Sequence, residues 1–564
     1  MWMTDLPPAF IYYIGALLVL IPQHRIRAAA LLAIPILGGL AVYYLPDSTR
    51  IEFTVLGYDL MPVRVDKLSL IFAYVFNIAA FIAILYSFHV RDRMQQAAGV
   101  LYAGSALGVV FAGDLITLFV FWELLAFSSV FLIWAKRTQK SYQTGLRYLL
   151  LHALSGLILL GGAIGYYQSH GTFHFDYIGI DSIYGMLILL AIGIKCAFPF
   201  VHNWLTEAYP ESTPTGTVFL SAFTTKAAVY LLARSYPGTE LLVYIGAFMT
   251  CFPIFYAVIE NDLRRVLAYS MINQIGFMVC GIGIGTALAV NGAVAHAFND
   301  IIFKGLLFMA MGAVLTMTGR INGSDLGGLY KTMPKTTVLC IVGAASISAF
   351  PLFSGFVSKS MIMSAAIKEG YDFIWLALLF ASAGVFHHAG IKIPYFAFFA
   401  HDQGLRAADP PRGMLLAMTL SATLCIAIGV YPAALYSALP FSIEYTPYDT
   451  THVLAQTQIL FYSALAFVWL NLMKLYPPEL PSTNLDFEWI YRKFLPRVIS
   501  TGTTQLALAM GHITNSGHGL GTRIVQHLRE LSTMPAQLST MVQWTVIMLP
   551  LLLILALSKL FGYA

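Results

Sequence analysis

Runs of about 20 consecutive apolar residues recur along almost the whole of this chain, and no other feature limits its fold as strongly. A helix of that length crosses the roughly 30 Å apolar core of a bilayer. Only helices and closed barrels satisfy their backbone in lipid, and these runs lack the two-residue alternation of barrel strands. Of the 564 residues, 58% are hydrophobic and 10% are charged, whereas soluble domains carry about 25% charged residues. The sequence therefore predicts an all-α polytopic membrane protein.

The apolar runs predict about 14–16 transmembrane helices. We expect them near residues 10–24, 27–45, 68–90, 97–112, 114–134, 143–168, 181–198, 213–235, 241–259, 263–285, 288–317, 335–365, 372–400, 411–436, 451–474 and 541–561.

The basic residues predict the orientation of these helices. With the N-terminus outside and the helices alternating, the inner loops receive most arginine and lysine residues, as the positive-inside rule requires. The outer side keeps only Arg50, Arg64, Lys67, Arg234, Lys368 and Lys559. The formal net charge of +5 follows from this inner bias. It therefore indicates a lipid bilayer, not nucleic acid, as the partner.

Neither a cofactor nor a metal site is expected. The five cysteines stand singly inside apolar runs, without a Cys-x-x-Cys pair. This pattern argues against disulfides, iron–sulfur clusters and thiolate zinc sites. The sequence also lacks a phosphate-binding loop, a nucleophile elbow and a metal triad. We therefore predict one component of a transporter and not an enzyme.

Several ionisable residues fall inside the predicted helices. The lysines are Lys195, Lys226, Lys304, Lys359 and Lys392, and the accompanying acids and histidines are Glu123, Asp300, His152 and His296. A charge at the membrane centre costs about 2.5–3.5 kcal/mol, so these side chains must face one another or water. Buried lysine loses its proton readily, and histidine titrates near neutrality. We predict that the set forms a proton pathway.

A structural interpretation stands beside this prediction for some residues. Lys195 and Lys392 could extend their long side chains to the interface, and His152 could pack in the core. Asp66 and Asp114 lie at predicted helix starts, where an acid caps the helix. The residues with apolar sequence on both sides, for which we expect a functional role, are Glu123, Lys226, Lys304 and Lys359.

The tripeptide Ala-Phe-Pro occurs at 197–199 and at 349–351, each time beside a buried lysine. Proline breaks a helix, and broken helices at membrane depth line protein or water cavities. Corresponding breaks in two halves are typical of repeated transporters. We predict two inverted five-helix repeats, at 96–236 and 237–400, with N-terminal helices at 1–95 and C-terminal helices at 401–474.

The segment after these helices is more polar. Residues 475–540 predict one or two amphipathic helices on the cytoplasmic face, and residues 541–564 a final span. The amphipathic segment could clasp another protein of the same complex or rest on lipid.

Six stretches resemble motifs of the antiporter-like subunits that respiratory complex I and Mrp-type cation/proton antiporters share. They are FAGDLITLFVFWELL at 111–125, GIKCAFPFVHNWLTEAYPESTP at 193–214, SAFTTKAAVYLLAR at 221–234, NDLRRVLAYSMINQIGF at 261–277, AHAFNDIIFKGLLFMAMG at 295–312 and SISAFPLFSGFVSKSMI at 346–362. The resemblance covers roughly residues 60 to 400.

The resemblance implies roles for single residues. It places the family's proton carriers on Glu123, Lys195, Lys226, His296, Lys304 and Lys359. It implies an ion pair between Glu123 and Lys195 in the closed state. Many members carry a second histidine where this chain has Asp300. Lys359 and the stretch at 382–400 are most similar to the D-type subunits of Mrp antiporters.

The resemblance also implies an assembly. It indicates a proton-translocating component of a multi-subunit Na⁺/H⁺ antiporter in the bacterial inner membrane, with other membrane subunits as partners and protons and Na⁺ as the ions. Two alternatives stay open: a proton-pumping component of an NADH:quinone oxidoreductase-like complex, and an energy-coupling component for inorganic carbon uptake.

Overall fold

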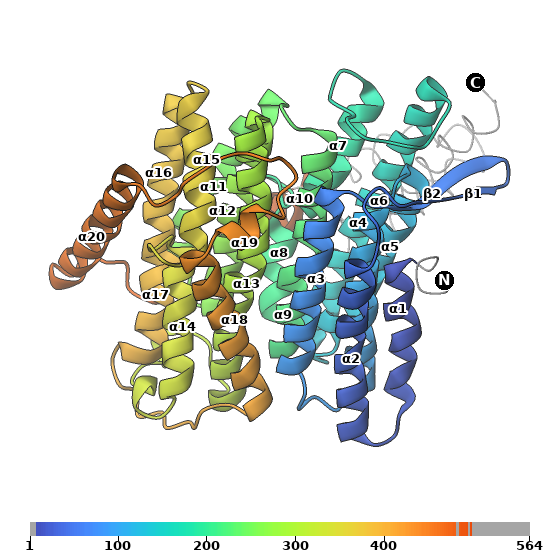
Figure 1. Ribbon diagram of the computed structural model, residues 1–564. Coiled ribbons are helices and arrows are strands. Elements are labelled where there is room, and N and C mark those ends of the chain that lie inside the picture. Colours follow the sequence, from blue (N-terminus) through green and yellow to red (C-terminus); the bar gives the residue numbers. More distant parts are fainter. Residues whose placement is uncertain (1–6, 481–483, 485, 495–496, 499–564) are drawn as a thin grey trace, which may run out of the picture.

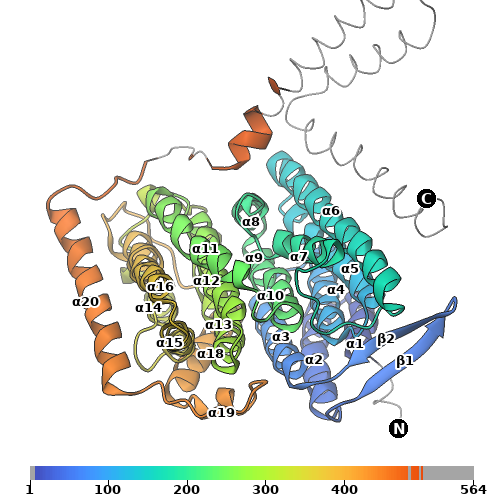
Figure 2. The ribbon, with the colours of Figure 1, turned by 90° about the horizontal axis from the view of Figure 1, so that it is seen from above.

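The computed structural model describes residues 7–480, 484, 486–494 and 497–498. Most of them lie in helices that stand side by side in one elongated bundle (Figures 1 and 2). The predicted span at 541–561 lies outside the described residues.

The N-terminal part holds three helices and a hairpin. The helices are α1 (Pro8–Gly15), continued by a 3-10 turn (Ala16–Leu20), α2 (His24–Tyr43) and α3 (Lys67–Tyr86). Between α2 and α3, β1 (Arg50–Val55) pairs antiparallel with β2 (Tyr58–Arg64). The sequence analysis missed this hairpin. Its turn residues, Leu56 and Gly57, both have positive φ, as a tight two-residue hairpin turn requires.

The first predicted repeat contains seven helical pieces. They are α4 (Arg93–Phe111), α5 (Leu115–Trp134), α6 (Gln139–His170), α7 (Ile183–Lys195), α8 (Asn203–Glu211), α9 (Pro214–Ala222) and α10 (Thr224–Ser235). Side-chain caps fix several helix starts. Asp114, for example, accepts from the backbone N–H groups of Ile116 and Thr117 and so begins α5. Asp66 caps α3 in the same way. The structural interpretation of both aspartates is confirmed.

The second predicted repeat also contains seven α-helical pieces. Its helices are α11 (Glu240–Ile259), α12 (Leu263–Ile284), α13 (Ala287–Thr318), α14 (Pro334–Ile347), α15 (Ser354–Lys368), α16 (Asp372–Val385) and α17 (Lys392–Pro394). Short 3-10 turns lie at Gly323–Asp325 and Leu329–Lys331, and wide π-helical turns lie at Phe386–Ile391 and Tyr395–Phe399.

Three more helices complete the described chain: α18 (Arg412–Val430), α19 (Ala433–Tyr436) and α20 (Thr450–Leu472), with a last π-helical turn at Ile490–Phe494. In Figure 2, α20 stands at the edge of the bundle beyond α16.

The two Ala-Phe-Pro breaks have the same backbone geometry. After α7, Ala197 and Phe200 have φ of 60° and 71°, and after α14, Ala349 and Leu352 have φ of 58° and 71°. In each break the phenylalanine N–H donates to the carbonyl five residues earlier. Phe198 donates to Gly193 at 2.9 Å, and Phe350 donates to Ala345 at 3.0 Å. The broken helices that the sequence predicts are confirmed.

Other features recur in both repeats. α6 and α13 each have 32 residues and end at a glycine with positive φ. The loop after each returns to the aspartate that caps the second helix of its repeat, in the bridges Asp114–His174 and Asp262–Asn322. The domain boundaries proposed from the sequence remain predictions.

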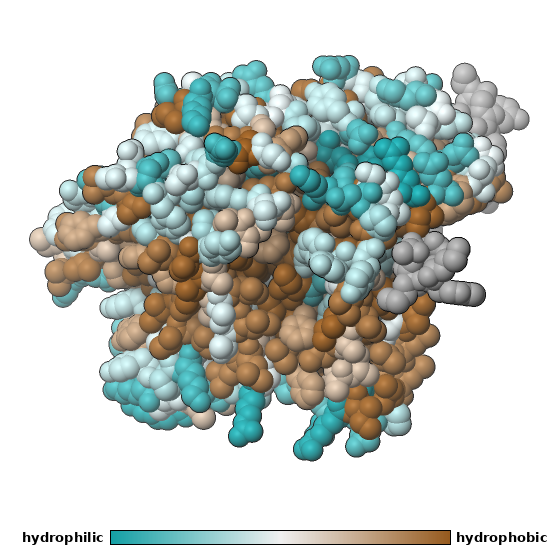
Figure 3. Space-filling view, viewed as in Figure 1, coloured by the Kyte–Doolittle hydropathy of each residue, from teal (hydrophilic) through white to brown (hydrophobic). Residues whose placement is uncertain are grey.

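On the face shown in Figure 3, an apolar band crosses the bundle between two more polar ends. Among the described residues, 12 helices are long and apolar enough to cross a membrane. Shorter apolar helices at Pro8–Leu20, Ile183–Lys195 and Pro334–Ile347 add to these. The chain is therefore a multi-pass α-helical membrane protein, as predicted.

Candidate functional site

The centre of the site is a buried ion pair between the two predicted repeats. Lys226 Nζ lies 2.6 Å from Asp300 Oδ2, and neither side chain has any exposure. The chain breaks between α9 and α10 at Phe223, and this break frees the carbonyl of Ser221, which accepts from Lys226 at 3.2 Å. Two charges removed from water need such partners, because desolvation would otherwise exceed their attraction.

Lys195 ends α7 on one side of this pair. Its ammonium donates to the carbonyl of Trp122 and lies 4.2 Å from the centre of the Trp122 ring. The next residue of α5, Glu123, is close enough for its charge to act on Lys195. The described residues show no direct ion pair between Glu123 and Lys195, and the Lys195 ammonium bonds the Trp122 carbonyl instead. Glu123 Oε1 has no hydrogen-bond partner within the described part of the chain.

Glu123 packs against α6 at Gly156, where a methyl group would collide with the carboxylate. One turn earlier on α6, His152 is fully buried between Tyr148 and Trp204, with ring centres 4.1 and 4.5 Å away. Both of its ring nitrogens lack a hydrogen-bond partner among the described residues. Buried polar atoms of this kind are commonly satisfied by water.

In the second predicted repeat, α13 presents His296, Asp300 and Lys304 at four-residue intervals, which places them on one helix face. His296 Nδ1 lies 2.9 Å from Ser358 Oγ and Nε2 lies 3.1 Å from Gln274 Oε1. Both ring nitrogens of His296 are therefore paired.

Lys304 and Lys359 extend this cluster. Lys304 donates to Ser270 at 2.8 Å, and Lys359 donates at 2.9 Å to the carbonyl of Ile347, at the break between α14 and α15. Lys359 Nζ also lies 5.0 Å from the centre of the Phe277 ring. The charges of Lys226, Lys304 and Lys359 all act on His296, so these groups form one electrostatic unit.

Lys392 lies apart from this cluster. Its ammonium donates to the carbonyls of Val258 and Glu260 at 2.7 Å each, at the end of α11, and pairs with Glu479 at 3.0 Å. Neither Lys392 nor Lys195 has any exposure, so the interpretation that they reach the interface is wrong. Lysine is favourable at a helix C-terminus, and Lys392 lies at the end of α11 in this way, whereas its place in the proton pathway stays a prediction.

The sequence analysis missed His388, which the wide π-helical turn after α16 places in the interior. It is fully buried, and the charges of Lys304 and Lys392 act on its ring. Its two ring nitrogens make no hydrogen bond to the described residues. The sequence shows two adjacent histidines at 387–388 in an apolar run, but it does not show which one points inward.

A polar cavity of about 500 Å³ opens between the repeats on the side where α8 ends and α12 begins. Its acids include Glu207, Glu211 and Glu260. Burial opposes the ionisation of Glu211, but hydrogen bonds from Lys140 and Lys136 hold the pKa of this carboxyl below its usual range. The cavity lies beside the end of α8, shortly before α9 begins.

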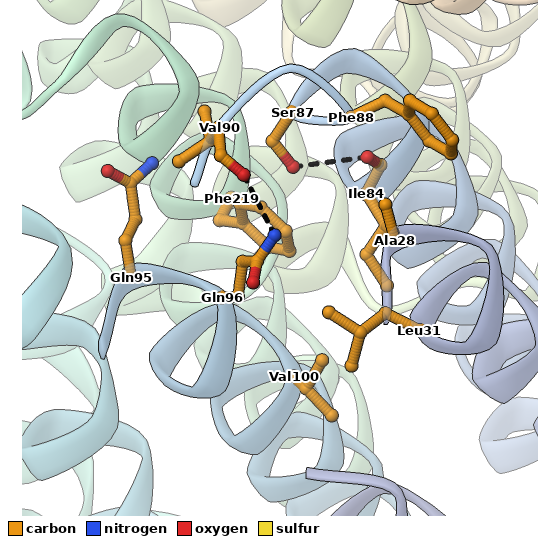
Figure 4. Close-up of a pocket in the computed structure, with 10 residues that line it drawn as sticks. All are labelled: Ala28, Leu31, Ile84, Ser87, Phe88, Val90, Gln95, Gln96, Val100 and Phe219. Carbon is orange, nitrogen blue, oxygen red and sulfur yellow. Dashed lines mark hydrogen bonds between the residues drawn. The ribbon is translucent and has the colours of Figure 1, made fainter. Parts of the chain in front are cut away.

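A second cavity, shown in Figure 4, lies between α2, α3 and α4. Its volume is about 10 Å³, which is the space of one water at most. Gln96 donates to the carbonyl of Val90 beside it, and Ser87 to that of Ile84. Both bonds are local, and Arg27, which donates to Gln96 Oε1 at 2.8 Å, also bonds backbone carbonyls, so this small cavity belongs to the packing of the N-terminal helices and is not the candidate site.

Comparison with known proteins agrees with this architecture. Residues 112–385 match the family described as "NADH:quinone oxidoreductase/Mrp antiporter, TM". The chain is 30% identical over 457 residues to the A subunit of a Na⁺/H⁺ antiporter of Alkalihalophilus pseudofirmus, which covers 71% of this chain and 55% of that protein. It is 32% identical over 400 residues to the A/B subunit of a probable K⁺/H⁺ antiporter of Rhizobium meliloti, covering 64% of this chain and 40% of that protein.

Among solved structures, one protein of the Mrp complex from Dietzia sp. superposes with a TM-score of 0.76 at 22% identity, covering 91% of this chain and 62% of that protein. At this identity the likeness shows the fold. This chain spans about half the length of the curated relatives it matches. The names of these relatives mark them as A-type or A/B-type, and the expected similarity to the D-type stays a prediction.

Proposed function

We propose that this chain, which belongs to the antiporter-like membrane subunits shared by Mrp-type antiporters and respiratory complex I, translocates protons in a multi-subunit monovalent cation/proton antiporter. The observation that carries the proposal is the buried Lys226–Asp300 pair with further ionisable residues on both sides. A membrane protein keeps such costly groups where protons or ions move.

The proposed route begins at the polar cavity and the group of Glu123, His152 and Lys195. The ring nitrogens of His152 and one carboxylate oxygen of Glu123 have no partner among the described residues, which favours water in this group. A proton released by Lys195 reaches Lys226 at the centre. It continues through His296 and Lys304 to Lys359.

The charge of Glu123 controls the first step. Opposite charges attract strongly in a low-dielectric interior. A movement of Glu123 toward Lys195 therefore favours the protonated lysine, and a movement away favours proton release. Lys195 keeps its bond to the Trp122 carbonyl in both arrangements. A small displacement of the Glu123 carboxylate is therefore enough to change the protonation of Lys195.

The exchanged cation and the partners are also proposals. We propose Na⁺, because the Alkalihalophilus relative is named for it, although the Rhizobium relative is named for K⁺. We propose other membrane subunits as partners and a bacterial inner membrane as the location.

A second candidate function is proton pumping in a redox complex, which the name of the matched family favours. Neither candidate places a redox centre in this chain.

Vesicles that contain the whole complex test the proposal. We expect Na⁺ or K⁺ to release protons from acid-loaded vesicles, and we expect Lys226→Ala to abolish this release while the complex still assembles. Thr457→Ala, at an exposed position of α20, is the control. If the wild-type complex shows no cation-dependent proton flux but responds to an electron donor, the redox candidate replaces the first.

A further inference from the structure

Ser364, His452 and Asp449 form a series of close polar contacts on the side of Lys359 that the predicted topology places outside, and we name these three residues the outer relay. Ser364 Oγ lies 2.8 Å from His452 Nε2. His452 Nδ1 lies 2.6 Å from Asp449 Oδ2. Tyr445 also reaches Ser364, with its hydroxyl 3.2 Å from Oγ. The series joins α15 to the start of α20.

Exposure rises along the outer relay. Ser364 is 6% exposed, the His452 side chain 30% and the Asp449 side chain 47%. Lys359, on the same helix as Ser364, is 2% exposed. The series therefore leads from the buried lysine toward solvent.

A cavity of about 260 Å³ lies beside Lys359, Ser364 and His452. Lys359, Ser360, Ser364, His452 and Gln456 all line it, together with apolar residues of α15, α16 and α20. A water molecule occupies about 30 Å³ in the liquid, so the volume of this cavity is enough for several waters beside Ser364 and His452.

Contacts to neighbouring elements fix the position of this region at the outer end. The loop before α20 is pinned to α13, because Asn291 donates to the carbonyl of Phe441 at 2.7 Å and accepts from its N–H at 3.1 Å. Asn291 lies in the first turns of α13. Gly285, shortly before α13, lies against Gly238, shortly before α11, and both helix starts are on the outer side in the predicted topology.

The geometry points to the outer relay as the proton exit from Lys359, and this inference rests on the proposed function. With Nδ1–H facing Asp449, Nε2 is free to accept a proton from the Ser364 hydroxyl. Ser364 regains a proton from water that Lys359 has protonated. The imidazolium then loses its Nδ1 proton to Asp449 or to the outer solution. Asp449 passes any proton that it accepts to the outer solution, and one proton has then crossed. The ring is left as the Nε2–H tautomer, and a flip of the ring or proton exchange with water restores Nδ1–H before the next proton crosses.

The same order of residues occurs in serine hydrolases, but the surroundings here do not suit that chemistry. Ser364 lies inside α15, where the backbone N–H groups are already bonded within the helix. Such a serine lacks the free N–H donors that stabilise an oxyanion. The charged and titratable groups that face His452 are Asp449, Tyr445 and, across the cavity, Lys359.

The test uses right-side-out vesicles with the complete complex, in which the outer face meets the buffer. His452→Gln keeps a side chain that can bond Ser364 but cannot carry a proton, and we expect proton flux to fall about tenfold or more. Thr457→Ala on the same helix and His401→Gln, an exposed histidine of the inner loop, should leave the flux unchanged.

Rescue separates proton transfer from a structural function. We expect external imidazole to restore flux in His452→Ala and to leave Lys359→Ala inactive. An unchanged rate in His452→Gln, or a loss in His452→Ala that imidazole does not relieve in an assembled complex, would overturn the outer relay. If Lys359→Ala is also fully active, the proposed function itself fails, so the two failures are distinct.

Discussion

Lys226 on α10 and Asp300 on α13 form an ion pair at 2.6 Å in the interior of the bundle, and neither side chain touches solvent. The pair joins the two predicted repeats at their contact. Its two members belong to different helices, so the pair couples the charge state of one repeat to that of the other.

Removal of one member of this pair should cost both transport and stability. We expect Asp300→Asn to leave an unpaired buried lysine and to lower the free energy of unfolding by about 3–5 kcal/mol. The double variant Lys226→Met/Asp300→Leu removes both charges, and we expect it to recover most of this loss without recovering proton flux. Thermal unfolding of the purified complex and flux in vesicles measure the two effects. Equal stability of the single variant and the wild type would contradict the prediction.

A methyl group at Gly156 should displace Glu123. An added Cβ there would collide with the Glu123 carboxylate, so we expect Gly156→Ala to reduce proton flux about as strongly as Glu123→Gln. Gly161, on the same helix, has open space around an added Cβ. Gly161→Ala is therefore the matched control, and flux in vesicles is the measurement. Full activity of Gly156→Ala would show that the position of Glu123 is unimportant.

The break after α14 holds Ala349 in a strained backbone conformation. Ala349 has a φ of 58°, which costs a non-glycine residue about 1–2 kcal/mol. We expect Ala349→Gly to raise the free energy of unfolding by up to about 1 kcal/mol. Ala345→Gly, inside α14, should lower it by about 1 kcal/mol. Thermal unfolding of both variants shows whether each substitution raises or lowers the stability. A lower stability of Ala349→Gly would contradict the predicted strain at this position.

Asp402 should keep the inner loop after α17 in its folded position even at mildly acidic pH. A side-chain hydrogen bond from Arg406, then one from Lys331, keeps the pKa of Asp402 below its usual range. A carboxyl with a lowered pKa contributes stability above its unfolded pKa of about 3.9 and loses it as the pH falls through the folded pKa. We therefore expect equal protease resistance of this loop at pH 7 and pH 5 in inside-out vesicles. Asp402→Asn should be cut faster at both values, and a wild-type loop that opens at pH 5 would contradict this.

The features best predicted from the sequence are those that composition and neighbouring residues determine, such as the burial of a lysine or the end of a helix. Lys226 and Lys304 stand in long apolar runs, so their burial follows from the cost of exposing them to lipid. The two breaks follow from Pro199 and Pro351, because proline ends a helix.

Contacts between distant segments could not be predicted from the sequence. Hydrogen bonds such as Lys304–Ser270 depend on how separate helices turn toward each other. The outer relay lay beyond the motifs, and His452 stands near a helix start, where a polar residue is ordinary. The hairpin at 50–64 was missed because its strands are short and partly exposed.

Four of the buried lysines bond a backbone carbonyl: Lys195 at Trp122, Lys226 at Ser221, Lys359 at Ile347 and Lys392 at Val258 and Glu260. A carbonyl is a fixed dipole that stays in place whether or not the ammonium carries its proton. The interior can therefore hold a variable number of positive charges without rebuilding its framework. Under the proposed function, the same scaffold would serve the loaded and the empty state, and only the solvent and a few carboxylates would need to rearrange during a transport cycle.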